Sequence, residues 1–533
     1  MYDNTARIQQ ELSTFKLGFC GKLDPENRWI KMAGMIPWDL LEPEYSHHFN
    51  NTGRPAKRFR VALGTLIVQQ TLKLTDRETV ELISENPYVQ FFLGFPEFQA
   101  KIPFDSSLLV YFRKRLSWES IAKINELIVK VTPPEPENAQ VSSDGDDNDK
   151  GSGVAEETLL QHKMPVQGTL ILDATCCPAD IRHPQDLSLI DEARRKTEEI
   201  IDAIHAEYGN KKPRTDRLKA RVHFLSVIRK RQKLPIELQK ATRKQLGYLN
   251  RNLRTIDQMV KLQDISWPGK SALQVLSRQQ FRNLLVVQEF YKQQRYMLTL
   301  KTRKVPDRIV SISQPHVRPI IRGKARSDTE FGAKISVAVH DGMVFVDRMS
   351  FDAYSESHDV EMQAEAYRSR TGHYPASILA DKAYQNRANR QWCQDRGIRL
   401  MGNKLGRPFE NPAMNRLFKR FARMDEIQRV EIEGRIGIQK RRYGWDLIKG
   451  KKQESAMTMI MLVALVANLA QGMRGIHLAL FRFLYKESIK INNLRMGINC
   501  WSNQLMVTVC EESWIFQQAS YKIRSAPITF MAS

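Results

Sequence analysis

The chain has 533 residues, of which 42% are hydrophobic, and this is enough apolar material to fill the cores of two or three domains. Such a composition excludes an intrinsically disordered protein. The net charge of +23 and the pI near 9.7 favour a polyanionic partner, because neutralising phosphates releases counterions. We expect nucleic acid, since no amphipathic basic segment points to the rival partner, an anionic membrane surface.

Residues 1–131 predict an N-terminal helical domain. Helical patterns cover residues 60–72, 76–86 and 106–131, and Thr75 precedes the second of them as an N-cap. Residues 132–157 follow, and their Pro, Gly, Ser and acidic residues predict a flexible linker. The six cysteines of the chain lack zinc-finger spacing, which is typical of a reducing compartment.

The next region, residues 158–485, begins with a buried strand at 168–172 that ends in Asp173. Helical patterns follow, and we place a helical insertion at about 187–325. From Lys211 to Arg254 the chain has fifteen Lys and Arg against two acids, with apolar residues recurring between the bases. This pattern indicates basic helices with one packed face, and we interpret them as a DNA-gripping surface rather than a merely solvated one.

Strand patterns return after the insertion, so periodicity alone predicts a mixed α/β domain. The Asp-Gly pair between the first two runs predicts a hairpin turn. The apolar run 457–470 is short for a membrane span, and we expect a buried core helix there. No motif identifies a role for the tail at 486–533. The other elements are strands at 333–340, 343–351 and 376–380, the last ending in Asp381, and helices at 357–370, at 386–396 and around Glu433.

Three carboxylates, Asp173, Asp381 and Glu433, are the candidate catalytic residues. A lone buried carboxylate is costly unless it is paired, hydrogen-bonded or bound to a cation, and two acidic strand ends side by side would bring two anions together. At helical spacing Arg429 and Lys440 lie on the face of Glu433, which suits a site that binds a metal and also grips phosphate. For Glu433 alone, a solvated helix with intrahelical ion pairs is the alternative.

These segments resemble the DDE transposases of bacterial insertion sequences, in the group whose third acid carries a Tyr, Arg, Glu, Lys signature. Arg429, Glu433 and Lys440 match both gaps of the signature, whereas Glu426 stands where the family has Tyr. Two more stretches look like the family's first-Asp and second-Asp motifs: residues 172–184, and residues 380–384 with Ala383 where Gly is commoner.

The resemblance implies a fold and a reaction. The expected fold is a ribonuclease H-like α/β core with a helical insertion after its first strand, plus the all-helical N-terminal domain. The expected reaction is metal-dependent cleavage at the ends of an insertion sequence and strand transfer of these ends into target DNA. The N-terminal domain is expected to bind the terminal inverted repeats of the element through a helix in the major groove, with oligomerisation as its alternative role.

Two Mg²⁺ ions, for which Mn²⁺ substitutes, are the expected cofactors. Asp173 would bridge both ions, and Asp381 and Glu433 would each complete one of them. Protein contacts to double-stranded DNA are expected from these residues: Arg429, Lys440, Arg441, Arg442, Tyr443, Lys382, Arg113, Lys114 and Arg115.

The resemblance also implies a homodimer in the DNA complex and a nucleoid-associated protein of the bacterial cytoplasm without a membrane partner. Two alternatives stay open. One is a ribonuclease H-like nuclease that stops at hydrolysis. The other is an inactive copy of the element that acts as a non-catalytic DNA-binding protein, a possibility left open by Glu426, Ala383 and the tail.

Overall fold

The computed structural model of the protein describes residues 15–17, 21–47, 49, 56–101, 104–131, 166–208, 212–266, 271–324, 327–402 and 412–474. The predicted linker at 132–157 and the predicted tail at 486–533 lie outside these residues.

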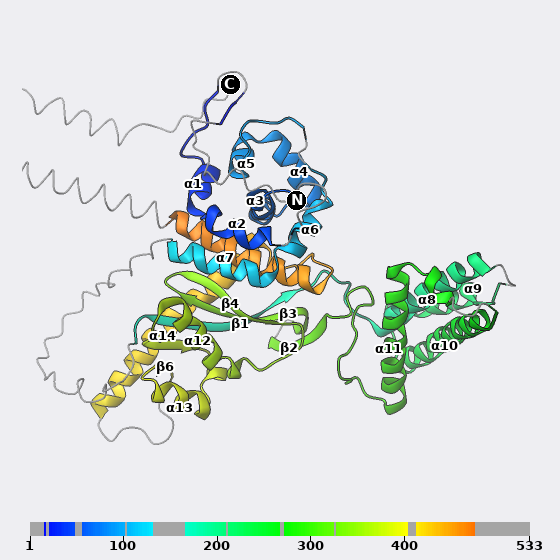
Figure 1. Ribbon diagram of the computed structural model, residues 1–533. Helices are drawn as coiled ribbons and strands as arrows, with labels where there is room; N and C mark the ends of the chain where they lie inside the picture. Colours follow the sequence, from blue (N-terminus) through cyan, green and yellow to red (C-terminus); the bar gives the residue numbers. More distant parts are fainter. Residues whose placement is uncertain are drawn as a thin grey trace, which may run out of the picture. The chain divides into compact units, whose positions relative to one another are not determined.

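The N-terminal region is helical, as predicted (Figure 1). Thr75 caps the fourth helix, because its hydroxyl accepts from the Glu78 N–H and the Glu78 carboxylate accepts from the Thr75 N–H. The helices are α1 (Arg28–Met35), α2 (Trp38–Ser46), α3 (Phe59–Leu72), α4 (Asp76–Glu85), α5 (Pro87–Phe92), α6 (Leu108–Arg115) and α7 (Trp118–Val131).

The prediction of one helix over residues 106–131 is wrong. Leu116 ends α6 with ψ at 80°, outside the helical range. The Ser117 hydroxyl then accepts from the Ser120 N–H and begins α7. The local capping signal of Ser117 therefore overrides a helical pattern that continues across it.

A mixed six-stranded sheet forms the centre of the α/β region. β3 pairs antiparallel with β1, β2 and β4, whereas β5 runs parallel to both β1 and β6, giving the order β4-β3-β1-β5-β6. Gly332 of β3 lies between Pro178 of β1 and Arg318 of β2, so β2 lies on the same side of β3 as β4. The strands are β1 (Thr169–Pro178), β2 (Arg318–Lys324), β3 (Ser327–His340), β4 (Met343–Ser350), β5 (Ser377–Ala380) and β6 (Arg399–Leu400).

The sequence predicts this sheet in part. The hairpin turn is confirmed, with φ of 51° at Asp341 and 70° at Gly342, both in the left-handed region that such turns require. The first strand does not end at Asp173 but continues to Pro178, because residues 174–178 keep pairing with β3. The predicted insertion boundary near 325 wrongly includes β2, whose Pro, Gly and two Arg hide its strand character.

Helices of the α/β region cover both faces of the sheet. The odd-numbered β1 residues Ile171 and Cys177 belong to a large core that also contains side chains of the N-terminal helices, of α14 and of helix Gln453–Arg474. The even-numbered Leu170 and Leu172 belong to a smaller core with α12 and α13. These helices are α12 (Val360–Thr371), α13 (Arg387–Asp395) and α14 (Pro412–Ile438).

A buried amide, Asn468, joins three parts of the large core. Its Oδ1 accepts from the Val344 N–H at 2.8 Å, and its Nδ2 donates to the Val344 carbonyl at 2.8 Å and to Asn125 Oδ1 of α7 at 2.9 Å. The N-terminal helices, the hairpin and the last described helix therefore share one core, so residues 1–131 do not form a separate unit in the structure.

Helix Gln453–Arg474 is the one described helix whose length and apolar composition would allow it to cross a membrane. It is mostly buried within the protein, and Ile460, Val463 and Leu465 are fully covered. This burial agrees with the predicted core helix.

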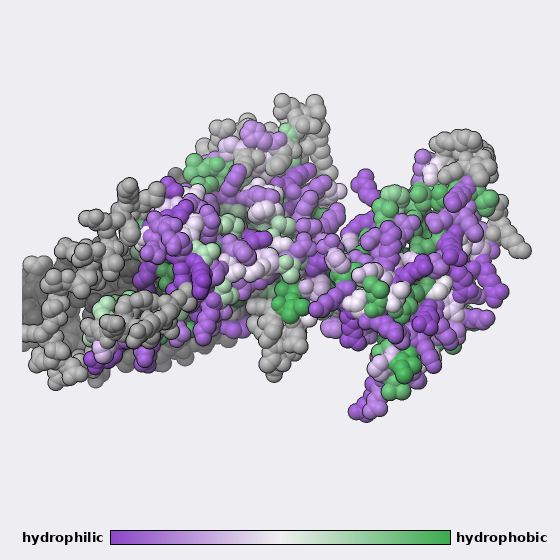
Figure 2. Space-filling view, turned by 90° about the horizontal axis from the view of Figure 1, so that it is seen from below, coloured by the Kyte–Doolittle hydropathy of each residue, from purple (hydrophilic) through white to green (hydrophobic). Residues whose placement is uncertain are grey.

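The insertion after β1 has a hydrophobic core of its own. On the face of the molecule that Figure 2 shows, most of the described surface is hydrophilic, with scattered apolar patches. Leu218 and Val222 of α9 are exposed among basic residues. The helices of the insertion are α8 (Asp186–Tyr208), α9 (Arg217–Ile228), α10 (Pro235–Ser266), η3 (Ala272–Val275) and α11 (Arg278–Leu300).

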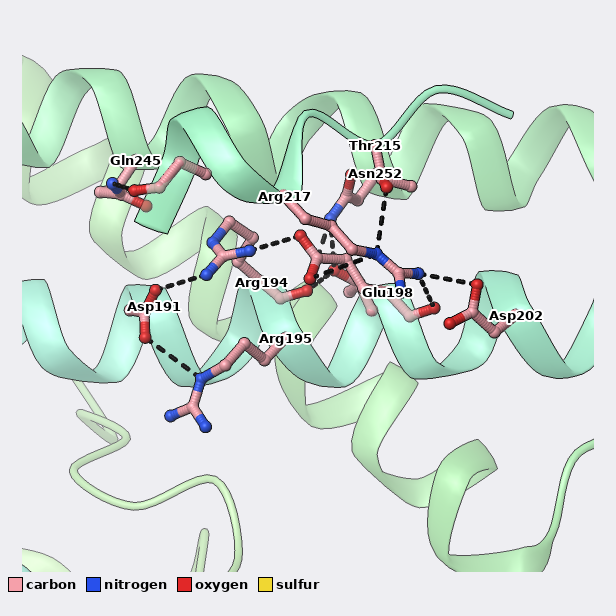
Figure 3. A network of polar contacts seen from close by, with 11 residues as sticks. Asp191, Arg194, Arg195, Glu198, Asp202, Thr215, Arg217, Gln245 and Asn252 are labelled. Carbon is pink, nitrogen blue, oxygen red and sulfur yellow. Dashed lines mark hydrogen bonds and ion pairs between the residues drawn. The ribbon is translucent and has the colours of Figure 1, made fainter. Parts of the chain in front are cut away.

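A buried polar network connects α8, α9 and α10 (Figure 3). Arg194, 2% exposed, forms ion pairs with Asp191 and Glu198 on its own helix α8. Burial raises the pKa of Glu198, and the charges of Arg194 and Arg217 oppose this shift. Arg217 also pairs with Asp202 at 2.7 Å, which fastens the start of α9 to α8.

We expect Arg194→Leu to destabilise the insertion by about 3 kcal/mol, because Asp191 and Glu198 lose their buried cation and keep the partly exposed Arg195 and Arg217. Hydrogen exchange should accelerate in α8 to α11 and stay unchanged in the sheet. Arg221→Leu is the matched control, since Arg221 is an exposed arginine of α9. Equal exchange rates in the two variants would contradict a stabilising role for the buried network.

We expect Asn468→Ala to lower the free energy of unfolding by about 2 to 4 kcal/mol, because the Val344 N–H and the Asn125 amide lose a buried partner. Urea unfolding followed by hydrogen exchange should show α7, β4 and helix Gln453–Arg474 losing protection together. The exposed Glu454→Ala is the control. Loss of protection confined to the last helix would contradict a shared core.

Candidate functional site

The pairing of β1 with β5 sets two predicted catalytic residues side by side. Leu172 pairs with Ala380 in parallel register, so Asp173 and Asp381 occupy the next position on adjacent strands. Asp381 keeps an extended backbone, with φ −64° and ψ 164°. Adjacent strands lie about 4.8 Å apart. Both residues share the face of Ile171 and Leu379, which is the face that α14 covers.

Asp173 lies in a setting that disfavours its charged form. Burial raises the pKa of its carboxyl, and the negative charges of Glu356 and Asp381 add to this effect. The Ala174 N–H, which donates to Oδ1 at 2.7 Å, and the Arg429 cation oppose it without cancelling it. A cation at this position would therefore stabilise the ionised carboxylate.

Glu433 lies on α14, and Arg429 interacts both with it and with Asp173. Ile432 and Ile436 pack α14 into the large core, while Glu433 is 53% exposed. The Arg429 guanidinium forms an ion pair with Glu433 at 2.9 Å and also acts on Asp173. The pair of Arg429 with Glu433 agrees with the alternative interpretation of Glu433, which is an intrahelical ion pair. The charge of Arg429 acts on Asp173 as well, so it interacts with two of the three candidate acids.

The helix changes its pitch directly after α14. Residues Gln439–Tyr443 form a π-helical turn, η6, which ends at Gly444 with φ 100°. Because a π turn holds more residues than an α turn, Lys440 does not keep the angular position that α-helical spacing predicts from Glu433. Single π turns within helices occur frequently at functional sites.

Two N-terminal residues hold this turn in place. Gln70 of α3 donates to the Tyr443 carbonyl, and Lys73 donates to the Arg441 carbonyl at 2.8 Å. Both contacts satisfy carbonyls at the end of a helix, where partners are otherwise missing. Sequence reasoning missed Gln70 and Lys73, since no local pattern indicates a contact between residues about 370 positions apart.

The structure corrects two sets of interpretations. Tyr443 is 3% exposed, so its ring is buried and unsuited to contact DNA. Arg113 forms an ion pair with Asp76 at 2.7 Å, and the Arg115 guanidinium lies 4.6 Å from the centre of the Phe49 ring. Lys114 is exposed. Each of the two arginines thus has a structural partner.

Among the described residues, no other segment brings its backbone close to Gly434 or Gly437 of α14. A Cβ at Gly434 would meet nothing within 4 Å. At Gly437 the nearest group is the Arg441 side chain. The other predicted DNA contacts, Lys382, Arg441 and Arg442, are exposed.

The donor set suits a hard divalent cation. Asp173 and Asp381 are adjacent carboxylates, each with Oδ1 accepting one backbone N–H, and such oxygens are the ligands that Mg²⁺ prefers. Among the described residues no three His, Cys, Asp or Glu side chains lie close enough to form a complete metal cluster. The two aspartates therefore fit a metal, whereas Glu433 is paired with Arg429.

Two family models match the chain. A transposase domain of the family DUF772 matches residues 20–115, and a transposase DDE domain matches residues 378–470. The second range contains Asp381 and Glu433, while Asp173 lies before it.

A curated relative is an uncharacterized protein, ORF8 in the nfe locus of Rhizobium meliloti. It is 33% identical over 109 residues, which are 20% of this chain and 53% of the relative. The chain thus spans about half the length of the curated relative that it matches. No solved structure matches the chain significantly.

The raised pKa of Asp173 has a consequence for stability. An acid whose pKa is higher in the folded chain than in the unfolded chain costs folding free energy once it ionises, and the cost is absent at a pH below the ordinary Asp range. We expect Asp173→Asn to raise the Tm of the metal-free protein at neutral pH and to lose this gain toward about pH 4.

Thermal melts in EDTA across this pH range measure the difference. Asp257→Asn, at an exposed position of α10, is the control for the change in charge. A Tm difference between Asp173→Asn and the wild type that stays constant with pH would refute the role of ionisation.

Proposed function

Because the chain belongs to the DDE transposases of insertion sequences, we propose that it cleaves DNA at the ends of its element and joins these ends to target DNA. The observation that carries this proposal is the register of β1 and β5, which sets Asp173 beside Asp381 on the face that α14, the helix of Glu433, covers. Two acids from distant segments thus lie side by side, and α14, which packs on the same face, carries the third.

The strand order supports a ribonuclease H-like core. An antiparallel β4-β3-β1 set continues into parallel β5 and β6, with helices on both faces. In this interpretation the helical insertion interrupts the core between β1 and β2, and α14 contributes the third acid.

Asp173, Asp381 and Glu433 would hold two Mg²⁺ ions, with Mn²⁺ as a substitute. When bound, the ions lower the pKa of a water or hydroxyl nucleophile and stabilise the leaving oxygen of a phosphodiester. The acids are the sole protein groups that this chemistry requires, and no side chain needs to act as a nucleophile.

Arg429 would exchange partners when DNA binds. In the metal-free protein its guanidinium pairs with Glu433 and acts on Asp173. A DNA phosphate offers the bidentate anion that a guanidinium prefers. Arg429 would then hold phosphate beside the three acids, with Lys440, Arg441 and Arg442 of η6 and Lys382 near Asp381 as further contacts.

The basic insertion would grip DNA outside the catalytic site. Lys240, Arg243 and Lys244 are exposed on one face of α10 and repeat at helical spacing. A row of cations on one face supplies the sequence-independent affinity on which transposition depends. Lys114 of α6 remains a proposed contact to the terminal repeats.

Further parts of the proposal are a homodimer that holds two element ends together and a place beside the nucleoid in the bacterial cytoplasm. A nuclease that stops at hydrolysis would use the same acids, and an inactive copy would bind DNA without cutting it. Both alternatives make distinct predictions for a cleavage assay.

We expect Glu433→Gln to reduce Mg²⁺-dependent nicking of labelled DNA that carries the element's ends by at least about 100-fold, because metal catalysis supplies several kcal/mol. Glu431→Gln is the matched control. Glu431 is also an exposed acid of α14 paired with an arginine four residues away, Arg435, at 3.1 Å. The control should cleave at the wild-type rate.

The products separate the alternatives. Nicks at the element's ends without joined products would indicate a nuclease. Tight binding without any nicking by the wild type would indicate an inactive copy. Equal loss of activity in both variants would show a general defect in α14 and would contradict a specific role for Glu433.

A further inference from the structure

A groove of about 700 Å³ lies where the N-terminal helices meet the chain that follows the π turn. Its first wall comes from α3, α4 and α6, and its second wall from residues 444–459. The apolar part of the lining includes Leu74, Val110, Leu447 and Met459, while its polar part contains five cations and two acids. Neither the catalytic acids nor the insertion contributes to this lining.

Hydrogen bonds fix the second wall to the rest of the protein. The Ile448 N–H donates to the Pro178 carbonyl at 2.8 Å, and the Asp180 N–H donates to the Ile448 carbonyl at 3.0 Å, so the wall pairs with the end of β1. Trp445 is fully buried, and its indole N–H donates to the Ile460 carbonyl at 2.9 Å. The groove is therefore preformed.

The two acids of the lining are already paired. Asp76 accepts a hydrogen bond from Arg113. Burial alone would raise the pKa of Asp76, but the hydrogen bonds from Arg113 and Gln69 outweigh this effect and lower the pKa. Asp446 lies 3.5 Å from Lys73. The other cations of the lining are three exposed lysines, Lys449, Lys451 and Lys452, which leave the groove with an excess positive charge.

We propose that this groove binds the sugar-phosphate backbone of a DNA strand next to the catalytic helix, with Lys449, Lys451 and Lys452 contacting its phosphates. The inference rests on the proposed function and adds a DNA contact to it. Lys73 shows that the groove lies next to η6, because it lines the groove and also donates a hydrogen bond to the Arg441 carbonyl of η6. The proposed phosphate contacts of the site begin at this turn.

Charge complementarity favours a DNA strand over an apolar partner. Three lysines within four residues match the close spacing of backbone phosphates, and their long side chains reach them without a fixed geometry. The apolar floor suits the sugar edge or a base of a strand whose end is unpaired. Duplex and single-stranded DNA share the same phosphate chemistry, so both belong in the test.

The test compares DNA binding by two triple variants of the full chain that remove the same charge. Lys449→Ala, Lys451→Ala and Lys452→Ala change the groove. Lys22→Ala, Lys57→Ala and Lys101→Ala change exposed lysines of the N-terminal region that do not line it. Each set is made with Glu433→Gln to suppress cleavage, and circular dichroism melts check that both remain folded.

Fluorescence anisotropy with labelled DNA carrying the element's ends, as duplex and as single strand, gives affinity against salt. We expect the plot of log affinity against log salt to be less steep for the groove variant, by about 3 units of slope. Its affinity at 0.1 M salt should fall on the order of 100-fold. Lysine-to-arginine replacement at the same positions should retain the wild-type slope. A larger loss with the single strand assigns the groove to an unpaired end, and a larger loss with the duplex assigns it to intact DNA.

A photo-crosslinking residue at Val110 identifies the occupant directly. Crosslinks to DNA support the proposal, and crosslinks to protein alone overturn it in favour of an acidic protein partner. Equal salt slopes for the groove variant and the matched control also overturn it, while cleavage by the wild type leaves the proposed function intact. A wild type that binds through the groove without cleaving would instead refute the catalytic function alone.

Discussion

The parallel pairing of β1 with β5 is the constraint on which the candidate site depends. Because Leu172 faces Ala380, the residues that follow on both strands are acids that share one face. A shift of one residue in this register would turn Asp173 and Asp381 toward opposite faces of the sheet. The register is secured by burial, since Leu170, Leu172, Ile378 and Ala380 are fully covered. Hydrophobic packing on one face thus sets the distance between two charges on the other.

Burial raises the pKa of Asp173, and the negative charges of Glu356 and Asp381 add to this shift. Arg429 opposes part of this shift and also forms an ion pair with Glu433, so its charge acts on two of the three acids. The π turn after α14 is held by Gln70 and Lys73 of the N-terminal helices. The position of the π turn at the end of α14 therefore depends on residues near the start of the chain, and the two parts also share a hydrophobic core.

The sequence predicts the local features well. The Thr75 cap, the Asp341-Gly342 hairpin, the Asp381 strand end and the buried helix near residue 460 all follow from short patterns. Three kinds of feature cannot be predicted from such short patterns. β2 pairs through its backbone despite poor strand residues, the π turn shifts the phase of Lys440, and the burial of Tyr443 depends on distant packing. The assignment of Arg113 to DNA failed for the same reason, because its partner Asp76 lies on another helix.

The position of Gly332 between Pro178 and Arg318 bears on how this architecture varies among relatives. The chain leaves the sheet after Pro178 and returns at Arg318, on the two sides of a single β3 residue. These points lie about 10 Å apart, twice the spacing of adjacent strands. A Cβ at Gly332 would come within 2.1 Å of the Cys177 carbonyl oxygen, so the junction tolerates no larger residue without movement. A short loop could span the same gap, and the insertion with its own core could therefore be lost, enlarged or exchanged in evolution while the strand register and the acids stay where they are.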